Sequence, residues 1–183
     1  MNSSRLMGCF VSAALLSGSP VVQAASPYAG QDSREIKALS PEDAEAYLSG
    51  KGMGLAKAAE LNGYPGPSHV LALAIDLALT AEQKSRTESL FKRMESDAIA
   101  LGRPLIEEER RLDELFASKA ITRESLARSL NRIGELQAQL RQVHLETHLA
   151  QVEILTPAQV ARYMALRGYV GGARTNEHPG RKH

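Results

Sequence analysis

LTAEQ at residues 79–83 recurs as LTPAQ at residues 155–159, so one pattern, LTxxQ, bounds both ends of a long central span. In each copy the threonine can cap the first free N–H groups of a helix, and the glutamine three residues on can reach back to the N–H of the threonine. In the second copy a proline stands at the first helical position, where its missing N–H costs nothing. The pattern predicts that a helix begins at each copy.

Between the two copies, apolar and small residues recur at alternating spacings of four and three, which is typical of the buried seam of two packed helices. One seam runs over residues 87–115 and the other over residues 126–154. Only residues 117–121 separate the two predicted helices, so the chain must fold back there as an antiparallel hairpin. Gly102 and Pro104 interrupt the first helix, and we expect a bend at this point.

Short helices are predicted on the N-terminal side of this hairpin, at residues 40–48, 55–61 and 68–79, where runs of glycine and proline separate them. No segment shows the alternating pattern of a β-strand. The sequence therefore predicts an all-α fold, a long, bent antiparallel helical hairpin with short flanking helices.

A leader of the secretory type is predicted at the N-terminus. Arg5 precedes an apolar run at residues 6–16, and small residues before Ala25 suit cleavage near Ala24. The apolar run is too short to span a bilayer, so we expect export to the periplasm and no stable membrane insertion. Four parts are predicted: the signal peptide (1–24), an N-terminal segment with short helices (25–67), the LTxxQ helical-hairpin domain (68–167) and a disordered, mostly polar tail (168–183).

Charge and motif content argue against several classes of function. The chain has 22 Lys and Arg against 21 Asp and Glu, and a nucleic-acid surface would need a basic surplus. The one cysteine, Cys9, falls in the leader, so we expect neither a disulfide nor thiolate chemistry. The chain carries no glycine-rich phosphate loop, HExxH motif or nucleophile elbow, and we do not expect an enzyme.

Over roughly residues 68–167, and in its leader, the chain resembles the Spy/CpxP family, also called the LTxxQ-motif family. The motif residues that carry the resemblance are Leu79, Thr80, Gln83, Leu155, Thr156 and Gln159. The resemblance implies an exported, periplasmic protein that dimerises into a cradle of long bent helices. It also implies one of three activities: an ATP-independent chaperone, an envelope-stress adaptor, or a sensor or binder of heavy metals.

The leading expectation is a periplasmic stress protein that needs no cofactor and holds unfolded envelope proteins on the inner face of the cradle. Weak contacts would come from apolar side chains and from exposed arginines, for which the candidates are Arg86, Arg93, Arg128, Arg132 and Arg141. One alternative is a metal sensor that acts through a membrane-bound regulatory partner. Another is a helical protein-interaction module without chaperone activity.

A candidate metal site rests on His144 and His148, which stand four residues apart and so share one helix face. In antiparallel register they lie opposite the part of the first long helix that carries Glu88 and Glu95, and His69 could add a third nitrogen. Such ligands suit zinc, nickel or cobalt. The metal-sensing branch of the family has a similar layout, which carries over to His69, Glu88, His144 and His148. The alternative is that both histidines only hydrogen-bond to Glu88 or Glu95.

Overall fold

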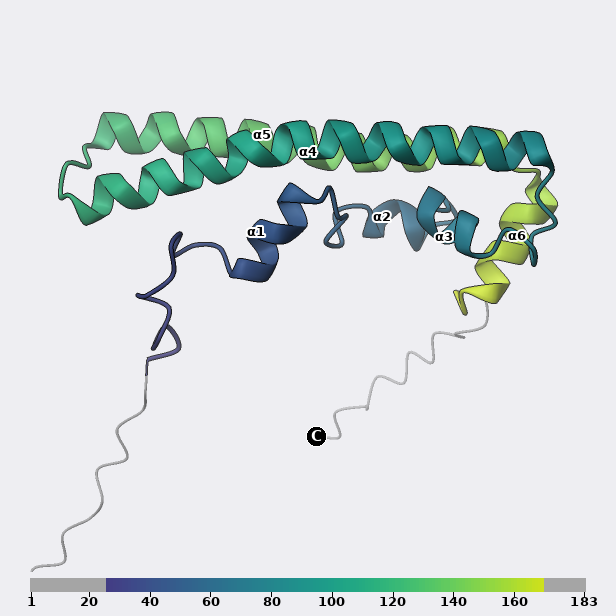
Figure 1. Cartoon of the computed structure of the whole chain (residues 1–183), viewed down its shortest axis with the longest axis horizontal. Helices are drawn as coiled ribbons and strands as arrows, with labels where there is room; N and C mark the ends of the chain where they lie inside the picture. Colours follow the sequence, from purple (N-terminus) through teal and green to yellow (C-terminus); the bar gives the residue numbers. More distant parts are fainter. Residues whose placement is uncertain (1–25, 170–183) are drawn as a thin grey trace, which may run out of the picture.

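The computed structural model describes residues 26–169, and the regular structure within this range is helical, with no strand. Two long helices, α4 (Ala81–Ala117) and α5 (Arg123–Ile154), run antiparallel and pack along each other (Figure 1). The all-α fold and the long helical hairpin predicted from the sequence are confirmed. The predicted leader, and the predicted tail from residue 170 onward, lie outside the described residues.

Both long helices begin at a threonine cap. The Thr80 hydroxyl accepts the backbone N–H of Gln83, and the Thr122 hydroxyl accepts that of Ser125. In each case the third helical residue returns a bond to the N–H of the threonine, which completes a capping box. Pro104 lies inside α4 without ending it, and Figure 1 shows α4 crossing α5 at a slant.

The interface between α4 and α5 holds the main core, built from Met94, Ala98, Leu105, Ile133, Leu136 and Leu140. Two side-chain hydrogen bonds fix the register, from Gln151 Nε2 to Thr87 Oγ1 (3.2 Å) and from Ser129 Oγ to Glu108 Oε1 (2.7 Å). Toward the open end of the hairpin the buried positions of α5 continue from Leu140 to His144, Thr147 and Gln151. Only 5% of the surface of His144 is exposed.

Residues 36–79, which we call the strap, lie along one side of the hairpin (Figure 1). The strap carries three short helices, α1 (Pro41–Leu48), α2 (Lys57–Glu60) and α3 (Pro67–Ala72). The first matches its prediction, including a capping box at Ser40. The second is shorter than the predicted 55–61, and its N-cap, Ala56, makes no side-chain hydrogen bond to the helix.

The third strap helix ends at Ala72, whereas we predicted a helix through residue 79. Beyond it the chain forms turns, and Ala78 adopts a left-handed conformation with φ of 47°, which an α-helix cannot contain. Leu77 is buried in a second core with Val70, Leu155 and Tyr163 of α6 (Pro157–Leu166). Packing against α6 therefore overrides helix propensity here. Within residues 26–169, no helix has both the length and the apolar character that crossing a membrane requires.

Candidate functional site

The two LTxxQ copies meet at the open end of the hairpin, although 76 residues separate them. Gln83 Nε2 donates to Gln159 Oε1 (2.8 Å), and Gln159 Nε2 donates back to Gln83 Oε1 (3.0 Å). Each of these amide oxygens also accepts the N–H of its own cap, Thr80 or Thr156. We call these two linked capping boxes the glutamine clasp.

The clasp also reaches the backbone of two further segments. Gln83 Nε2 donates to the carbonyl of Ile154 (2.9 Å), at the end of α5, and Gln159 Nε2 donates to the carbonyl of Leu77 (3.2 Å), in the strap. Leu155 is buried in the second core, and Leu79 packs against that core. The six motif residues thus hold together the start of α4, the end of α5, the start of α6 and the end of the strap.

A pocket of about 590 Å³ lies between the strap and the hairpin. The strap contributes residues 49–54, Glu60 and residues 66–69, and the segment after α6 contributes Arg167 and Tyr169. The hairpin wall of this pocket, which we call the covered face, consists of Phe91, Met94, Glu95, His144, Thr147 and His148. Apolar surface, three histidines and charges of both signs therefore line one cavity.

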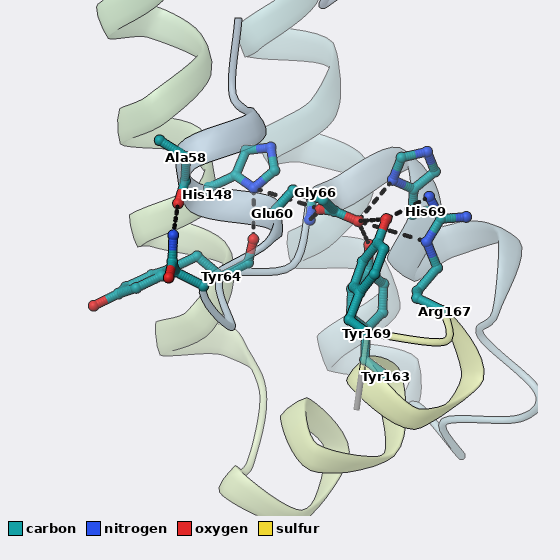
Figure 2. Close-up of polar contacts among 10 residues, drawn as sticks. Ala58, Glu60, Tyr64, Gly66, His69, His148, Tyr163, Arg167 and Tyr169 are labelled. Carbon is teal, nitrogen blue, oxygen red and sulfur yellow. Dashed lines mark hydrogen bonds and ion pairs between the residues drawn. The ribbon is translucent and has the colours of Figure 1, made fainter. Parts of the chain in front are cut away.

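Glu60 of α2 stands at the centre of a polar network at one end of this pocket (Figure 2). The residue is only 8% exposed. Its Oε1 accepts hydrogen bonds from the hydroxyls of Tyr163 and Tyr169, and its Oε2 accepts the N–H of Gly66 (3.1 Å). Because a buried carboxylate is costly without partners, these donors are what allow Glu60 to lie inside the fold.

Three cationic or titratable side chains surround the same carboxylate (Figure 2). His69 Nδ1 lies 3.4 Å from Oε1, Arg167 Nε lies 3.5 Å from Oε1, and His148 Nδ1 lies 3.8 Å from Oε2. His148 Nδ1 also lies 2.6 Å from the carbonyl oxygen of Tyr64, so Nδ1 carries a proton and donates to it. The Glu60 network therefore ties the strap to α5 and to the end of α6.

Tyr163 is wholly buried beneath Glu60. Burial raises the pKa of its phenol, and the hydrogen bond to Glu60 and the negative charge of that carboxylate raise the pKa further. The hydroxyl therefore stays protonated at neutral pH and acts as a donor. Sequence reasoning missed this network, because a single glutamate followed by the turn residues 62–67 signals a turn and gives no sign of burial.

His144 differs from the other histidines of the pocket. Its Nε2 is buried and has no hydrogen-bond partner among the described residues. Burial lowers the pKa of the imidazole, and a charge on His148 would lower it further, so the ring is neutral at neutral pH. On the strap side Gly52 packs against the ring, and a Cβ at Gly52 would stand 3.7 Å from His144 Nδ1.

The four predicted metal ligands are only partly brought together. His69, His144 and His148 all line the pocket, and two of them contact Glu60. Glu88 does not line it, and its nearest ionic partner is Lys84 of the same helix, at 4.0 Å. The carboxylate that lies beside His69 and His148 is therefore Glu60, and not Glu88 as we predicted. Within residues 26–169, no three His, Cys, Asp or Glu side chains are arranged to hold a metal ion, so the donors present do not form a ready site.

Glycines explain how the strap lies so close to the hairpin. A Cβ at Gly102 of α4 would stand 2.4 Å from the carbonyl oxygen of Tyr47 in α1. A Cβ at Gly50 would stand 2.9 Å from the carbonyl oxygen of Glu95, and one at Gly66 would stand 2.9 Å from the ring of His148. Such separations are shorter than van der Waals contact. At Gly102 and Gly50 the close atom belongs to the backbone, so only glycine fits there, while a Cβ at Gly66 would displace the His148 ring.

The five predicted client-binding arginines are all exposed, but their surroundings differ. Arg128 and Arg132 form ion pairs with Glu124 and Glu135 on their own helix, each at 2.8 Å. Arg86 and Arg93 instead line a shallow groove of about 310 Å³. The remaining walls of this open groove are Ser85, Ser89, Leu90, Ala150, Glu153 and Ile154. Because an α-helix has 3.6 residues per turn, Arg86, Ser89 and Arg93 lie on the side of α4 opposite Phe91 and Met94. The open groove is therefore opposite the covered face.

Comparison with known proteins finds no matching family model, no matching curated protein and no matching solved structure. Any function proposed for this chain therefore rests on the contacts described above and on its two LTxxQ copies.

Proposed function

We propose that this chain is an exported helical protein of the Spy/CpxP type, which binds unfolded envelope proteins weakly and reversibly without nucleotide. The observation that carries the proposal is the glutamine clasp. It gives the paired LTxxQ copies a single role, because Gln83 and Gln159 bind each other and close the open end of the hairpin. A long hairpin held at both ends is a rigid support for an extended binding surface.

The open groove is the surface that best suits an unfolded client. Leu90 and Ile154 offer apolar contact, while Arg86 and Arg93 offer planar cations on apolar stems that can bind carboxylates, backbone carbonyls and aromatic rings. Each such contact is weak at an exposed site, so binding would be reversible. Arg128 and Arg132 are already paired with neighbouring glutamates, so fewer of their N–H groups are free to bind a client.

Suppression of aggregation of a reduced, unfolding model protein, measured by light scattering without nucleotide, tests this proposal. The unsubstituted protein should suppress aggregation in proportion to its concentration. Arg86→Ala combined with Arg93→Ala should weaken suppression several-fold, whereas Arg128→Ala combined with Arg132→Ala, which removes the same charge, should have little effect. If the unsubstituted protein gives no suppression at several-fold excess over the client, the chaperone proposal is wrong and a plain interaction module is favoured.

We also propose that the functional unit is a homodimer. A hairpin of two helices buries only the seam between them, and outside the open groove it leaves Phe116, Leu130 and Leu149 exposed for a second copy to cover. Light scattering at micromolar concentration should give twice the monomer mass, and a monomer at that concentration would contradict this part of the proposal.

A second candidate function, sensing of zinc, nickel or cobalt, is favoured by one observation. Three histidines line a single pocket, and Nε2 of His144 has no partner there among the described residues. The donors do not form a ready site, so binding would require the Glu60 network to rearrange. Calorimetry should be done on protein carrying His178→Ala and His183→Ala, which removes the two remaining histidines. Heat that disappears in His144→Ala would support sensing, and no heat would exclude it.

A further inference from the structure

The strap depends on the hairpin for its structure. Its three helices have eight, four and six residues, and isolated helices of this length are not stable in water. Seven apolar side chains of the strap are buried, most of them small, namely Ile36, Ala46, Ala59, Pro65, Pro67, Val70 and Leu77. Because opening of a segment costs least where few apolar contacts hold it, the strap should open at lower free energy than the hairpin does.

Backbone approaches and polar contacts supply much of what holds the strap. Tyr47 and Leu55 pack on the edge of the main core, while Gly50 and Gly66 allow the strap backbone to touch α4 and α5 directly. The Glu60 network adds hydrogen bonds to Tyr163 and Tyr169, at the far end from α1. Attachments near Gly102 and at Glu60 therefore hold the strap over the hairpin, and the second core with the Gln159 bond to the Leu77 carbonyl holds its C-terminal end.

The space between these attachments is not filled. Part of the surface of Phe91 and Met94, on the covered face, borders the pocket of about 590 Å³. A cavity next to apolar side chains forgoes the attraction that close packing would give. A ligand that packs better on Phe91 and Met94 could therefore compete with the strap for this surface.

We propose that the strap is an internal, displaceable occupant of the covered face, and that unfolded polypeptide bearing apolar side chains competes with it for Phe91, Met94 and the neighbouring wall of α5. The strap itself shows the chemistry of the external occupant, because it is a chain of short, marginal helices that contacts the hairpin through its backbone and a few apolar side chains. This inference rests on the proposed binding of unfolded clients, and it adds a second, regulated surface to the open groove.

Two glycine substitutions provide a matched test. Gly102→Ala places a methyl group 2.4 Å from the carbonyl oxygen of Tyr47, so α1 must move away from α4. Gly134→Ala, within α5, meets no atom within 4 Å. Both substitutions replace glycine inside a long helix, so both raise the helix propensity of the hairpin equally. Any difference between the two variants therefore reports on the strap.

Hydrogen exchange and aggregation suppression should be measured on both variants. With Gly102→Ala, exchange over residues 41–72 should quicken by about tenfold or more, with α5 unchanged. Suppression per mole should rise several-fold, because the covered face is free more often. Gly134→Ala should match the unsubstituted protein in both measurements. Glu60→Gln, which weakens the other attachment, should act in the same direction as Gly102→Ala, and Glu45→Gln at an exposed site on α1 should have no effect.

The outcomes separate this inference from the proposed function. If Gly102→Ala and Glu60→Gln quicken exchange in the strap while suppression stays at the level of the unsubstituted protein, the strap does not compete with clients, although the open groove still binds them. If neither variant changes exchange in the strap, the two attachments do not hold it and the inference is wrong. If the unsubstituted protein and all variants fail to suppress aggregation, the proposed function fails and the inference fails with it.

Discussion

Breaking the glutamine clasp should destabilise the fold by an amount that the contacts allow to be worked out. The Gln83 side chain makes four hydrogen bonds, to the N–H of Thr80, to the carbonyl of Ile154, and two to the Gln159 amide. At about 0.5–1.5 kcal/mol for each net hydrogen bond, and with a discount for partial exposure, Gln83→Ala should cost about 2–3 kcal/mol. The Gln159 side chain also makes four hydrogen bonds, so Gln159→Ala should cost a similar amount.

The two substitutions share the reciprocal amide pair, so their effects should not add. Because the two shared bonds are lost in either single variant, the double variant should be less destabilised than the sum by about 1–2 kcal/mol. Urea unfolding of the four proteins in the cycle, followed by circular dichroism at 222 nm, gives this coupling energy.

A control for the clasp is available on the surface of α5. Gln142 makes one hydrogen bond, to Glu146 of the same helix, at an exposed position. Gln142→Ala should therefore change stability by no more than about 0.5 kcal/mol. A coupling energy near zero between Gln83 and Gln159, or a clasp variant no less stable than the control, would refute the reasoning that the two LTxxQ copies act as one structural unit.

Three further predictions follow from single sites. Thr80→Ala and Thr156→Ala should each cost about 1 kcal/mol in urea unfolding through the lost cap, and a change below a few tenths would contradict the capping role. The pKa of His144 is lowered from its ordinary value of 6.5, so the unfolded chain binds more protons and stability should fall as pH drops through that value. His144→Phe should reduce the loss of stability between pH 7.5 and 5.5. If the variant loses as much stability as the unsubstituted protein, His144 is not the cause of the pH dependence. Tyr163→Phe should cost about 1.5–3 kcal/mol through the lost bond to Glu60, while Tyr28→Phe, at a residue 74% exposed, should be neutral. If the two phenylalanine substitutions change stability equally, the hydrogen bond between Tyr163 and Glu60 does not stabilise the fold.

The hairpin could be predicted because its signals are local. A threonine cap, a glutamine three residues on and a four-three apolar spacing all act within a few turns of one helix. The antiparallel register then followed from the short turn, and the contact of Gln151 with Thr87 confirms it. The same register places His144 and His148 near Glu95, and all three side chains line one pocket.

The contacts of the strap with the hairpin could not be predicted, because they depend on which distant surfaces meet. Gly50 and Gly66 suggested helix breaks in the sequence, whereas the structure uses them for close approach to α4 and α5. Glu60 gave no signal, since its partners come from the strap, from α5 and from α6. The sequence predicts Glu88 as a metal ligand because it lies within a turn of the residues opposite His148, whereas the structure brings Glu60 of the strap to the histidines.

Binding of an unfolded client is the central claim, and hydrogen exchange with and without a permanently unfolded, reduced and alkylated model protein tests it most directly. We predict slower exchange of α4 around residues 85–93 and of α5 around residues 150–154, where the open groove lies, and faster exchange of the strap over residues 41–72. Identical exchange profiles with and without a saturating concentration of client would contradict the claim.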